Sequence, residues 1–312
     1  MPRAKIVSLI NYKGGVAKTT TTYHIGCSLA QHFNKKVLLV DIDPQTNLTF
    51  LCASIERWAE FKAKIGTIAT LYQRYAERIP LDTKRYIWRS PIRWDGRQVS
   101  NLDLIPCDID LLGEDLGGGQ VTGSFPSLEL LRRQSALYLR ERMFMQKLLR
   151  EVEDLYDYIL IDCPPNLYLM TQNALAASRW YLVTAIPDHL STIGLSILQK
   201  KVAKIGELLK SAQTFASDSK NSLTIAQLGG IIFVRVRIGG SVVTNVHSGK
   251  MEEVGRLMGQ GTCFSTNTTE LIGYSEAAES TAPIWMLESP NAVRAASKHE
   301  YQNITKEFLK RF

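Results

Sequence analysis

The sequence predicts an α/β fold: a doubly wound, mostly parallel β-sheet with helices on both faces. Short runs rich in β-branched residues recur along the chain, and longer segments with helical periodicity separate them. Runs that are apolar along nearly their whole length are typical of parallel strands buried on both faces. Ligands of such sheets bind at the carboxyl ends of the strands, which is where we expect a site.

Six segments have the strand pattern and five have the helical one. The expected strands are 5–10, 37–42, 102–105, 158–161, 181–186 and 230–234. The expected helices are 18–33, 128–155, 190–209, 243–258 and 291–309. Glycines 117–119 and the segment 121–126 indicate a loop. Because 45% of the 312 residues are hydrophobic and no Pro/Gly/Ser-rich linker interrupts them, we expect one domain over residues 1–312.

Residues 54–100 fit this pattern less well and are interpreted as an Arg/aromatic-rich elaboration on the α/β core. Such a mixture is found in nucleic-acid contacts, but arginines that solvate a helix and tryptophans that anchor it are commoner. The sequence leaves both interpretations open and favours the second. The residues concerned are Arg74, Arg78, Lys84, Arg85, Arg89, Arg93 and Arg97, interspersed with Tyr75, Tyr86, Trp88 and Trp94.

Composition limits the classes of partner and compartment. The net charge of +7 and the pI near 9.1 slightly favour polyanionic partners such as nucleic acids. The five cysteines are scattered, without a CxxC pair or a Cys/His cluster at zinc spacing, which predicts reduced thiols in a cytosolic protein. No apolar run approaches the roughly 18 residues that span a bilayer, and the N-terminus lacks a signal-peptide pattern. We therefore expect a cytoplasmic protein without a membrane partner.

The segment 11–20 lies between the first expected strand and the first expected helix, as a phosphate-binding loop requires. Its two glycines let main-chain N–H groups approach phosphate oxygens, and the helix start favours negative charge. Lys18 is expected to contact the β- and γ-phosphates, and the Thr19 hydroxyl to ligate Mg²⁺. An ordinary Gly-Gly turn is the alternative, which the match of five residue types disfavours. The expected phosphate-binding residues are Lys13, Gly14, Gly15, Val16, Ala17, Lys18, Thr19 and Thr20.

Three aspartates follow expected strands and so reach the same edge of the sheet. Asp41 and Asp43 end the strand 37–42, and Asp162 ends the strand 158–161. A carboxylate at this edge can hold Mg²⁺ or orient a water for attack on a γ-phosphoryl group. Capping of a turn before Pro44 is the plainer alternative for the first two. Asp157 precedes its strand and is expected to face solvent.

The loop departs from the ordinary Walker A pattern, which would place glycines at Tyr12 and Ala17, and it has an additional lysine, Lys13. This KGGxxKT pattern resembles the deviant Walker A family of P-loop NTPases that includes ParA and MinD. The resemblance spans nearly the whole chain and is weakest at 54–100 and 211–223. It continues through DxDPQ at 41–45 and through 158–165, 172–177, 191–195, 275–277 and 283–284.

The resemblance implies a role for each residue of the site. Lys13 would reach across a dimer interface to the partner's nucleotide, and Asp43 would activate the attacking water. Ala17 replaces a more usual glycine, which is harmless at a helical φ and costly at a positive one. We expect the helical φ. The catalytic residues implied are Lys13, Lys18 and Asp43, and the direct or water-mediated Mg²⁺ ligands are Thr19, Asp41, Asp43 and Asp162.

The resemblance further implies an ATPase with ATP and Mg²⁺ as cofactors and slow, partner-stimulated hydrolysis. Its members form ATP-bound homodimers, bind DNA nonspecifically and release it after hydrolysis stimulated by a ParB-like adaptor, so plasmid or chromosome partition and a nucleoid-associated location are implied here. The chain supplies candidate phosphate contacts of its own, although any single one is more commonly a solvated surface residue. These candidates are Arg235, Arg237, Lys250, Lys298, Lys306, Lys310 and Arg311.

Two other functions remain open at this point. A MinD-like membrane switch would need an amphipathic C-terminal helix, and Tyr301, Ile304, Phe308 and Phe312 do fall roughly on one face. Packing of that face against the sheet is the favoured interpretation. The ATPase motifs also do not distinguish DNA partition from the positioning of a protein cargo.

Overall fold

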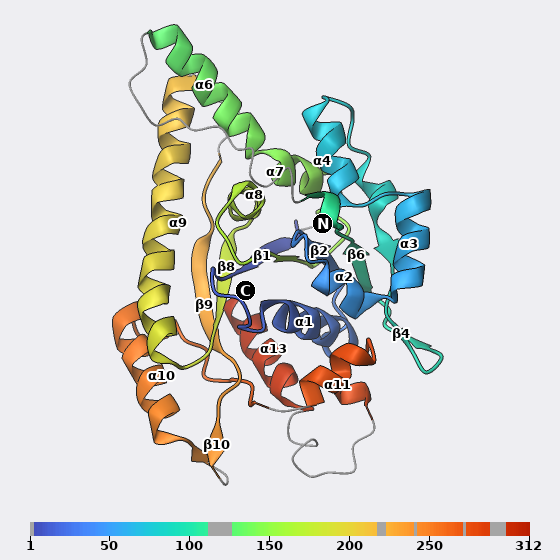
Figure 1. Cartoon of the computed structure of the whole chain (residues 1–312), viewed down its shortest axis with the longest axis vertical. Coiled ribbons are helices and arrows are strands. Elements are labelled where there is room, and N and C mark those ends of the chain that lie inside the picture. The colour runs from blue at the N-terminus through green and yellow to red at the C-terminus, as the bar shows by residue number, and fades with distance from the viewer. Residues whose placement is uncertain (1–2, 112–126, 217–222, 240–241, 271–272, 288–297) are drawn as a thin grey trace.

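The computed structural model describes residues 3–111, 127–216, 223–239, 242–270, 273–287 and 298–312. A seven-stranded sheet lies at its centre, in the order β3, β6, β2, β7, β1, β8, β9 (Figure 1). All neighbours are parallel except the edge strand β3, which pairs antiparallel with β6. The predicted fold class is therefore confirmed. The strands are β1 (Lys5–Ile10), β2 (Val37–Asp41), β3 (Trp88–Arg89), β6 (Leu102–Ile105), β7 (Tyr158–Asp162), β8 (Trp180–Ala185) and β9 (Gln227–Phe233).

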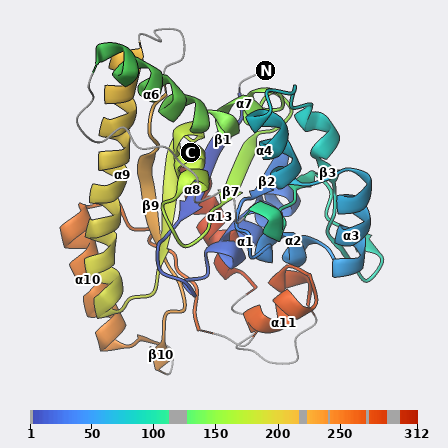
Figure 2. The same cartoon turned by 45° about the horizontal axis from the view of Figure 1, so that its top comes forward.

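Helices cover both faces of the sheet because the side chains of each strand alternate between them. In β1, Val7 and Leu9 join the core cluster under α1 and α13, whereas Ile6 and Ile10 join the cluster under α4, α7, α8 and α9. Figure 2 shows α9 running along one side of the molecule with α6 beside its end. The helices are α1 (Lys18–Phe33), α2 (Asn47–Cys52), α3 (Ile55–Lys64), α4 (Ile68–Ala76), α6 (Leu128–Glu141), α7 (Phe144–Arg150), α8 (Leu169–Ala177), α9 (His189–Ala216), α10 (Asn245–Met258), α11 (Gly273–Glu279) and α13 (Glu300–Arg311).

Most predicted elements are present, with shifted ends. The predicted helix 128–155 is divided into α6 and α7, because the N–H of Arg142 bonds to the carbonyl of Leu139 and turns the chain there. Strand β9 begins at Gln227, earlier than expected, and a register irregularity interrupts its pairing with β8. The predicted loop at 117–126 and part of the predicted helix 291–309 lie outside the described residues.

The elaboration at 54–100 is built onto one edge of the sheet. It contains α3 and α4, and its strand β3 extends the sheet beyond β6. Ile68 and Leu71 of α4 are fully buried in the core. The remaining pieces are the 3₁₀ helix Thr83–Tyr86 and an antiparallel hairpin of β4 (Arg93–Trp94) and β5 (Arg97–Gln98). Because β3 has only two residues, it is too short to show the periodicity by which a strand is predicted.

The C-terminal helix α13 packs on the sheet beside α1, as predicted. Tyr301, Ile304, Phe308 and Phe312 are all buried in the same core cluster as Tyr23 of α1. The apolar face that a membrane-binding helix would need is therefore covered. Among the helices of the described residues, none combines the length and the apolar character needed to cross a bilayer.

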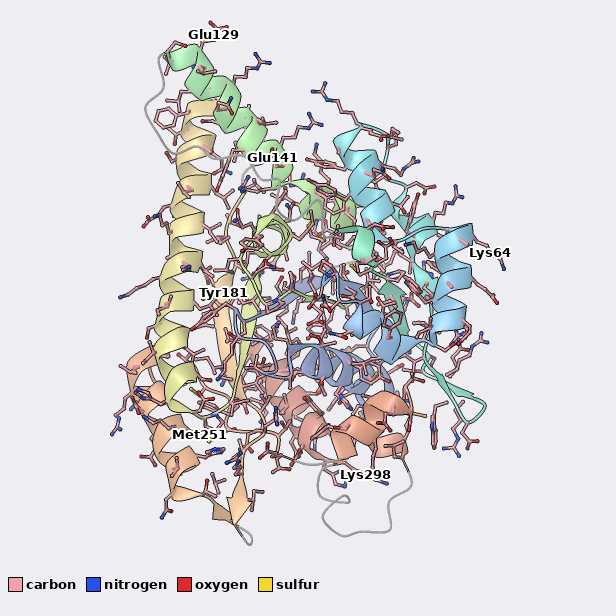
Figure 3. The ribbon with its side chains drawn as sticks, viewed as in Figure 1. Lys64, Glu129, Glu141, Tyr181, Met251 and Lys298 are labelled. Carbon is pink, nitrogen blue, oxygen red and sulfur yellow. The ribbon has the colours of Figure 1, made fainter. Side chains whose placement is uncertain are left out.

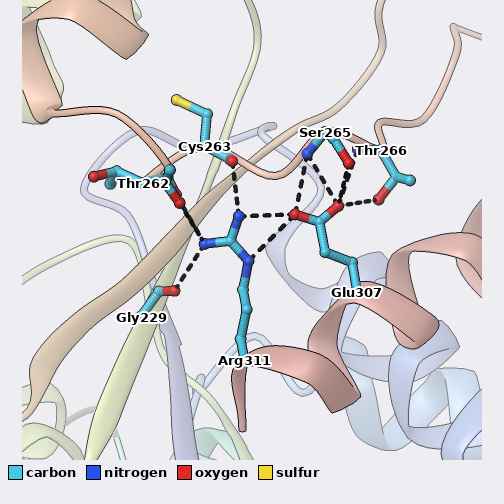
Figure 4. Close-up of polar contacts among 8 residues, drawn as sticks. Gly229, Thr262, Cys263, Ser265, Thr266, Glu307 and Arg311 are labelled. Atoms are coloured by element: carbon cyan, nitrogen blue, oxygen red, sulfur yellow. Dashed lines mark hydrogen bonds and ion pairs between the residues drawn. The ribbon is translucent and has the colours of Figure 1, made fainter.

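Arg311 fastens the end of α13 to the loop after β9. Its guanidinium donates to the carbonyl oxygens of Thr262 and Cys263 and to the Glu307 carboxylate, which accepts from Ser265 (Figure 4). The donors of Arg311 are thus engaged within the chain, and a DNA contact by this residue would have to replace these bonds.

Candidate functional site

The sheet brings the three predicted site segments to one edge. Strand β7 lies between β1 and β2, and its last residue, Asp162, is the register partner of Leu9 on one side and of Asp41 on the other. The loop after β1 and the loop after β2 therefore begin beside the same carboxylate. Parallel pairing thus places the phosphate loop and the predicted aspartates together, as expected from the strand pattern.

The loop at 11–17 is held open by its first residue. The Asn11 amide donates to the carbonyl of Thr184 at 2.8 Å and accepts from the N–H of Lys13 at 3.0 Å. Gly14 and Gly15 are exposed, and a Cβ atom at either would have no neighbour within 4 Å. Their main chain is therefore accessible to a bound anion, which fits the cradle that phosphates require.

Ala17 has φ 53° and ψ 30°, so the prediction of a helical φ at this position is wrong. The residue is the N-cap of α1, and its carbonyl accepts the first helical bond from the N–H of Thr21. The left-handed region costs a residue with a Cβ atom about 1 kcal/mol or more. The loop geometry that suits glycine is thus retained with alanine in its place.

Lys18 and Thr19 are the first two residues of α1 and lie next to Asp162. Lys18 is only 7% exposed. The Thr19 hydroxyl donates to one oxygen of Asp162 at 2.6 Å, and the Thr22 hydroxyl donates to the other at 3.2 Å. Burial raises the pKa of Asp162, while the Thr19 hydrogen bond and the charge of Lys18 oppose that shift. A hydroxyl and a carboxylate in contact supply the hard oxygen ligands that Mg²⁺ prefers.

Asp41 is engaged by the loop that follows it. One of its oxygens accepts from the Thr49 N–H at 2.9 Å and the Thr49 hydroxyl at 2.7 Å, and the other accepts from the Asp43 N–H at 3.1 Å. Burial, followed by the charge of Asp162, raises the pKa of Asp41. Asp41 therefore fixes the position of Asp43 and of helix α2. Thr49 was missed because no local pattern links it to a strand eight residues earlier.

Asp43 lies in the turn between β2 and α2. Its side chain is buried, with 6% of the residue exposed, and one oxygen accepts from the N–H of Gln45 at 3.0 Å. In the part of the chain that is described, no three or more His, Cys, Asp or Glu side chains form a metal-holding group. Mg²⁺ is commonly held by one or two carboxylates together with substrate phosphates, and the residues here fit that arrangement.

Lys13 pairs with a residue of its own chain. Its Nζ lies 2.8 Å from Asp188, just after β8, and 3.5 Å from the Ser191 hydroxyl. Asp188 also accepts from the N–H of Ser191 at 2.6 Å. The sequence had drawn attention to residues on both sides of Asp188 but not to Asp188 itself, since the pairing with Lys13 joins segments 175 residues apart.

The candidate DNA-contact residues are dispersed over several elements. Arg235 and Arg237 each form a 2.9 Å ion pair with Glu270, and Arg235 also donates to the carbonyl of Gly15 at 3.5 Å. With Asp188 they line a hollow of about 240 Å³, so they lie beside the phosphate loop. The other four are Lys250, paired with Glu253 at 2.6 Å, Lys298, and the exposed Lys306 and Lys310 of α13.

Comparison with known proteins agrees with this geometry. A family model described as an AAA domain matches residues 4–214. The chain is 28% identical over 313 residues to the chromosome-partitioning ATPase Soj of Treponema pallidum, and 98% of each chain is covered. It is 33% identical over 207 residues to the sporulation initiation inhibitor protein Soj of Bacillus subtilis, which covers 66% of this chain and 68% of that one.

Solved structures with the same fold include nucleotide complexes. The ATP complex of an aspartate-to-alanine variant of McdA from Cyanothece superimposes with a TM-score of 0.68 at 19% identity, covering 99% of this chain and 98% of that one. Cobyrinic acid a,c-diamide synthase from Mycobacterium smegmatis, with a bound ATP analogue and magnesium, gives a TM-score of 0.61 at 19% identity, with coverages of 98% and 95%. At these identities the likeness establishes the fold.

Proposed function

The chain belongs to the ParA family of partition ATPases, and from that membership we propose that it is an ATP-dependent dimerising switch. In the proposed cycle it dimerises with ATP, binds DNA without sequence preference, and drives plasmid or chromosome partition with a ParB-like adaptor. Hydrolysis, stimulated by the adaptor, ends each cycle. The observation that carries the proposal is the contact between Thr19 at the start of α1 and Asp162 at the end of β7, beside an open phosphate loop.

ATP and Mg²⁺ are the proposed cofactors. The exposed main chain of Gly14 and Gly15 and the side chain of Lys18 would bind the phosphates, and Thr19 and Asp162 would hold Mg²⁺. The metal would neutralise charge that develops on the γ-phosphoryl group. Asp43, whose place is set by Asp41, would orient the attacking water. The positions of these side chains support the proposal, because little rearrangement would be needed for nucleotide and Mg²⁺ to bind.

An exposed apolar surface beside Lys13 supports dimerisation. Tyr12, Tyr168, Ile193 and Ile197 are 42%, 52%, 50% and 44% exposed, and three of them line one hollow of about 600 Å³. Tyr12 lies against Gly194 of α9, where an added Cβ atom would collide with its hydroxyl. Apolar groups gathered on a surface mark sites of association. A second subunit seated here would bring its nucleotide within reach of Lys13.

Nonspecific DNA binding is proposed to use phosphate contacts from the six candidates named above. Lys306 and Lys310 are exposed on α13, whereas Arg235 and Arg237 would exchange Glu270 for a phosphate. Contacts of this kind make affinity fall steeply with salt, because each releases counterions from the DNA. The protein would then be associated with the nucleoid in the cytoplasm.

A DNA titration in three nucleotide states tests the proposed function. With ATP and Mg²⁺, the wild-type chain is expected to bind DNA of unrelated sequences equally well, and to bind more weakly with ADP or without nucleotide. Raising the salt from about 50 to 200 mM is expected to lower the affinity by at least tenfold. Lys18→Ala serves as the control that cannot use ATP. Equal DNA binding in all three nucleotide states would refute the switch.

A further inference from the structure

The elaboration holds most of the net positive charge of the chain. Residues 54–100 contain ten Lys and Arg and five Asp and Glu, a net charge of +5, whereas the whole chain has +7. The other 265 residues are therefore close to neutral. Attraction to a polyanion would be concentrated on this part of the molecule.

Helix α3 lies on the surface of the elaboration. None of its ten residues is fully buried. Its anchor is Trp58, whose indole N–H donates to the carbonyl of Cys107 at 3.0 Å and whose ring packs edge-on against Phe50. Figure 3 shows Lys64, at the end of α3, pointing away from the body of the protein. A helix held this way presents its charged residues to solvent at a fixed place.

Helix α3 and the strands β3 and β4 enclose a hollow of about 240 Å³. Its wall includes the rings of Phe61 and Trp88, which stack at a centroid distance of 4.7 Å with 5° between their planes. The Arg57 guanidinium lies 5.3 Å from the centroid of the Trp88 ring and donates to the carbonyl of Pro91 at 2.8 Å. The residues around the hollow are Arg57, Glu60, Phe61, Lys64, Trp88 and Arg93.

The positive charges of this hollow are poorly compensated. Among the residues that the structure describes, neither Arg57 nor Arg93 forms an ion pair, and Lys64 approaches Glu60 only at 3.9 Å, with both side chains largely exposed. Burial and the nearby charge of Arg93 lower the pKa of Arg57, and the charge of Glu60 opposes that shift only in part. Three cations around one carboxylate leave a net positive charge that favours an external anion.

The β4–β5 hairpin extends the same basic surface. It projects from the side of the molecule near α3 (Figure 1). Its tight turn has positive φ at Asp95 (47°) and Gly96 (69°), as two-residue hairpin loops require. Arg93 and Arg97 are both exposed and stand on either side of this turn. The hairpin therefore carries the Arg93 guanidinium at the hollow and the Arg97 guanidinium beyond it.

We propose that α3 and the β4–β5 hairpin form a nucleic-acid surface, in which Arg57, Lys64, Arg93 and Arg97 bind phosphates of a DNA backbone. Planar guanidiniums beside an aromatic wall suit phosphate recognition, and cations spread over several elements follow a backbone better than they fit a single small anion. The inference rests on the DNA binding proposed above and gives it a location separate from α13, Arg235 and Arg237.

The test compares two triple variants of the full chain in the ATP state. Lys64→Gln, Arg93→Gln and Arg97→Gln together remove exposed cations of the proposed surface, and Arg57 is left in place because it holds Pro91. The control removes three exposed arginines of α6 and α7, by Arg132→Gln, Arg133→Gln and Arg150→Gln, and so has the same net charge. ATP binding and basal hydrolysis, measured without DNA, are expected to be unchanged in both variants.

The surface variant is expected to bind DNA at least about tenfold more weakly at low salt, with a salt-dependence slope smaller by about 2 to 3. The control variant is expected to stay within about twofold of wild type. Equal losses in both variants would attribute binding to net charge and overturn the inference. Unchanged DNA binding, with weaker retention on polyglutamate, would identify an acidic protein partner and also overturn it. A wild-type chain that binds no DNA would instead refute the proposed function itself.

Discussion

The Nζ atom of Lys13 lies 2.8 Å from the carboxylate of Asp188 in the same chain. The resemblance assigns this lysine to the nucleotide of a second subunit. Both roles use the same ammonium group, so the internal pair must open before Lys13 can cross the interface. If the proposed dimer forms in this way, Asp188 would compete with it for Lys13, to an extent set by the free energy of the Lys13–Asp188 pair.

Asp188→Asn is expected to promote the ATP-dependent dimer. The amide retains an acceptor for the N–H of Ser191 but lacks the charge that holds Lys13. Because the pair is partly exposed, its loss is worth at most about 1 kcal/mol, or about fivefold in the dimer dissociation constant. Sedimentation velocity at graded protein concentrations would measure the dimer dissociation constant. Lys13→Ala is the opposing control, expected to leave ATP binding to the monomer but to remove the dimer. A dimer that survives Lys13→Ala would exclude the cross-subunit role.

Lys18→Ala is expected to abolish ATP binding. The ammonium group is buried beside Asp162 at the start of α1, where a phosphate would replace part of its lost hydration. Calorimetry with MgATP would detect the loss as an absence of heat at millimolar nucleotide. Lys250→Ala is a matched control, since Lys250 pairs with Glu253 on the surface of α10. ATP binding retained by Lys18→Ala would remove the phosphate loop from its assigned role.

Asp43→Ala is expected to permit the ATP dimer and to stop turnover. Asp41 and not Asp43 makes the contacts that hold α2, so the fold and the phosphate loop should survive the change. Phosphate release is expected to fall by at least about a hundredfold, and the protein to remain on DNA as long as ATP is present. Asp157→Ala, at an exposed position before β7, is the control. Hydrolysis at the wild-type rate would show that Asp43 is not the water-orienting residue.

Parallel strands made the core of the site predictable. Apolar runs located β1, β2 and β7, and their common direction was enough to predict that the loop at 11–17 meets Asp41, Asp43 and Asp162. The prediction that Asp157 is exposed is likewise confirmed. In each case the strand pattern is local in sequence, and the fixed pairing register of the strands then determines which residues become neighbours.

What the sequence could not predict depends on contacts between distant segments or on backbone strain. The Lys13–Asp188 pair joins two loops far apart in sequence, and the Asp41–Thr49 contact joins a strand end to a helix with which it shares no periodicity. The positive φ of Ala17 has no signal in the residue type, because alanine normally indicates helix. The family motif, with glycine at that position, was the better guide to its backbone.

Ala17→Gly is expected to stabilise the protein slightly. Glycine adopts φ near 53° without a Cβ clash, which recovers about 1 to 2 kcal/mol, and the greater freedom of the unfolded chain offsets part of this. A net gain of about 0.5 to 1 kcal/mol in the free energy of unfolding is expected from urea titration. Ala63→Gly, at an exposed position inside α3, is expected to cost about 1 kcal/mol. A loss of the same size at Ala17 would show that its conformation is not strained.

Because of His24, the free energy of unfolding is expected to decrease as the solution becomes more acidic. Its ring is buried in α1, contacts the Thr20 carbonyl and accepts from the N–H of Ile284, and burial lowers its pKa to about 4. The unfolded chain takes up a proton near pH 6.5 that the folded chain resists until about pH 4. Stability from this group is therefore complete above pH 6.5 and declines by up to about 3 kcal/mol on acidification to pH 4.

The measurement must separate His24 from two carboxyls that act in the opposite direction. Burial raises the pKa values of Asp41 and Asp162, so each contributes stability at acid pH that is lost as the pH rises. Their effect is common to the wild type and to His24→Gln, which keeps a donor and an acceptor but does not titrate. The difference in unfolding free energy between the two proteins is therefore expected to shrink steadily from pH 6.5 to 4. A difference that stays constant over this range would mean that the imidazole is charged when folded, and that its contact with Ile284 does not require the neutral ring.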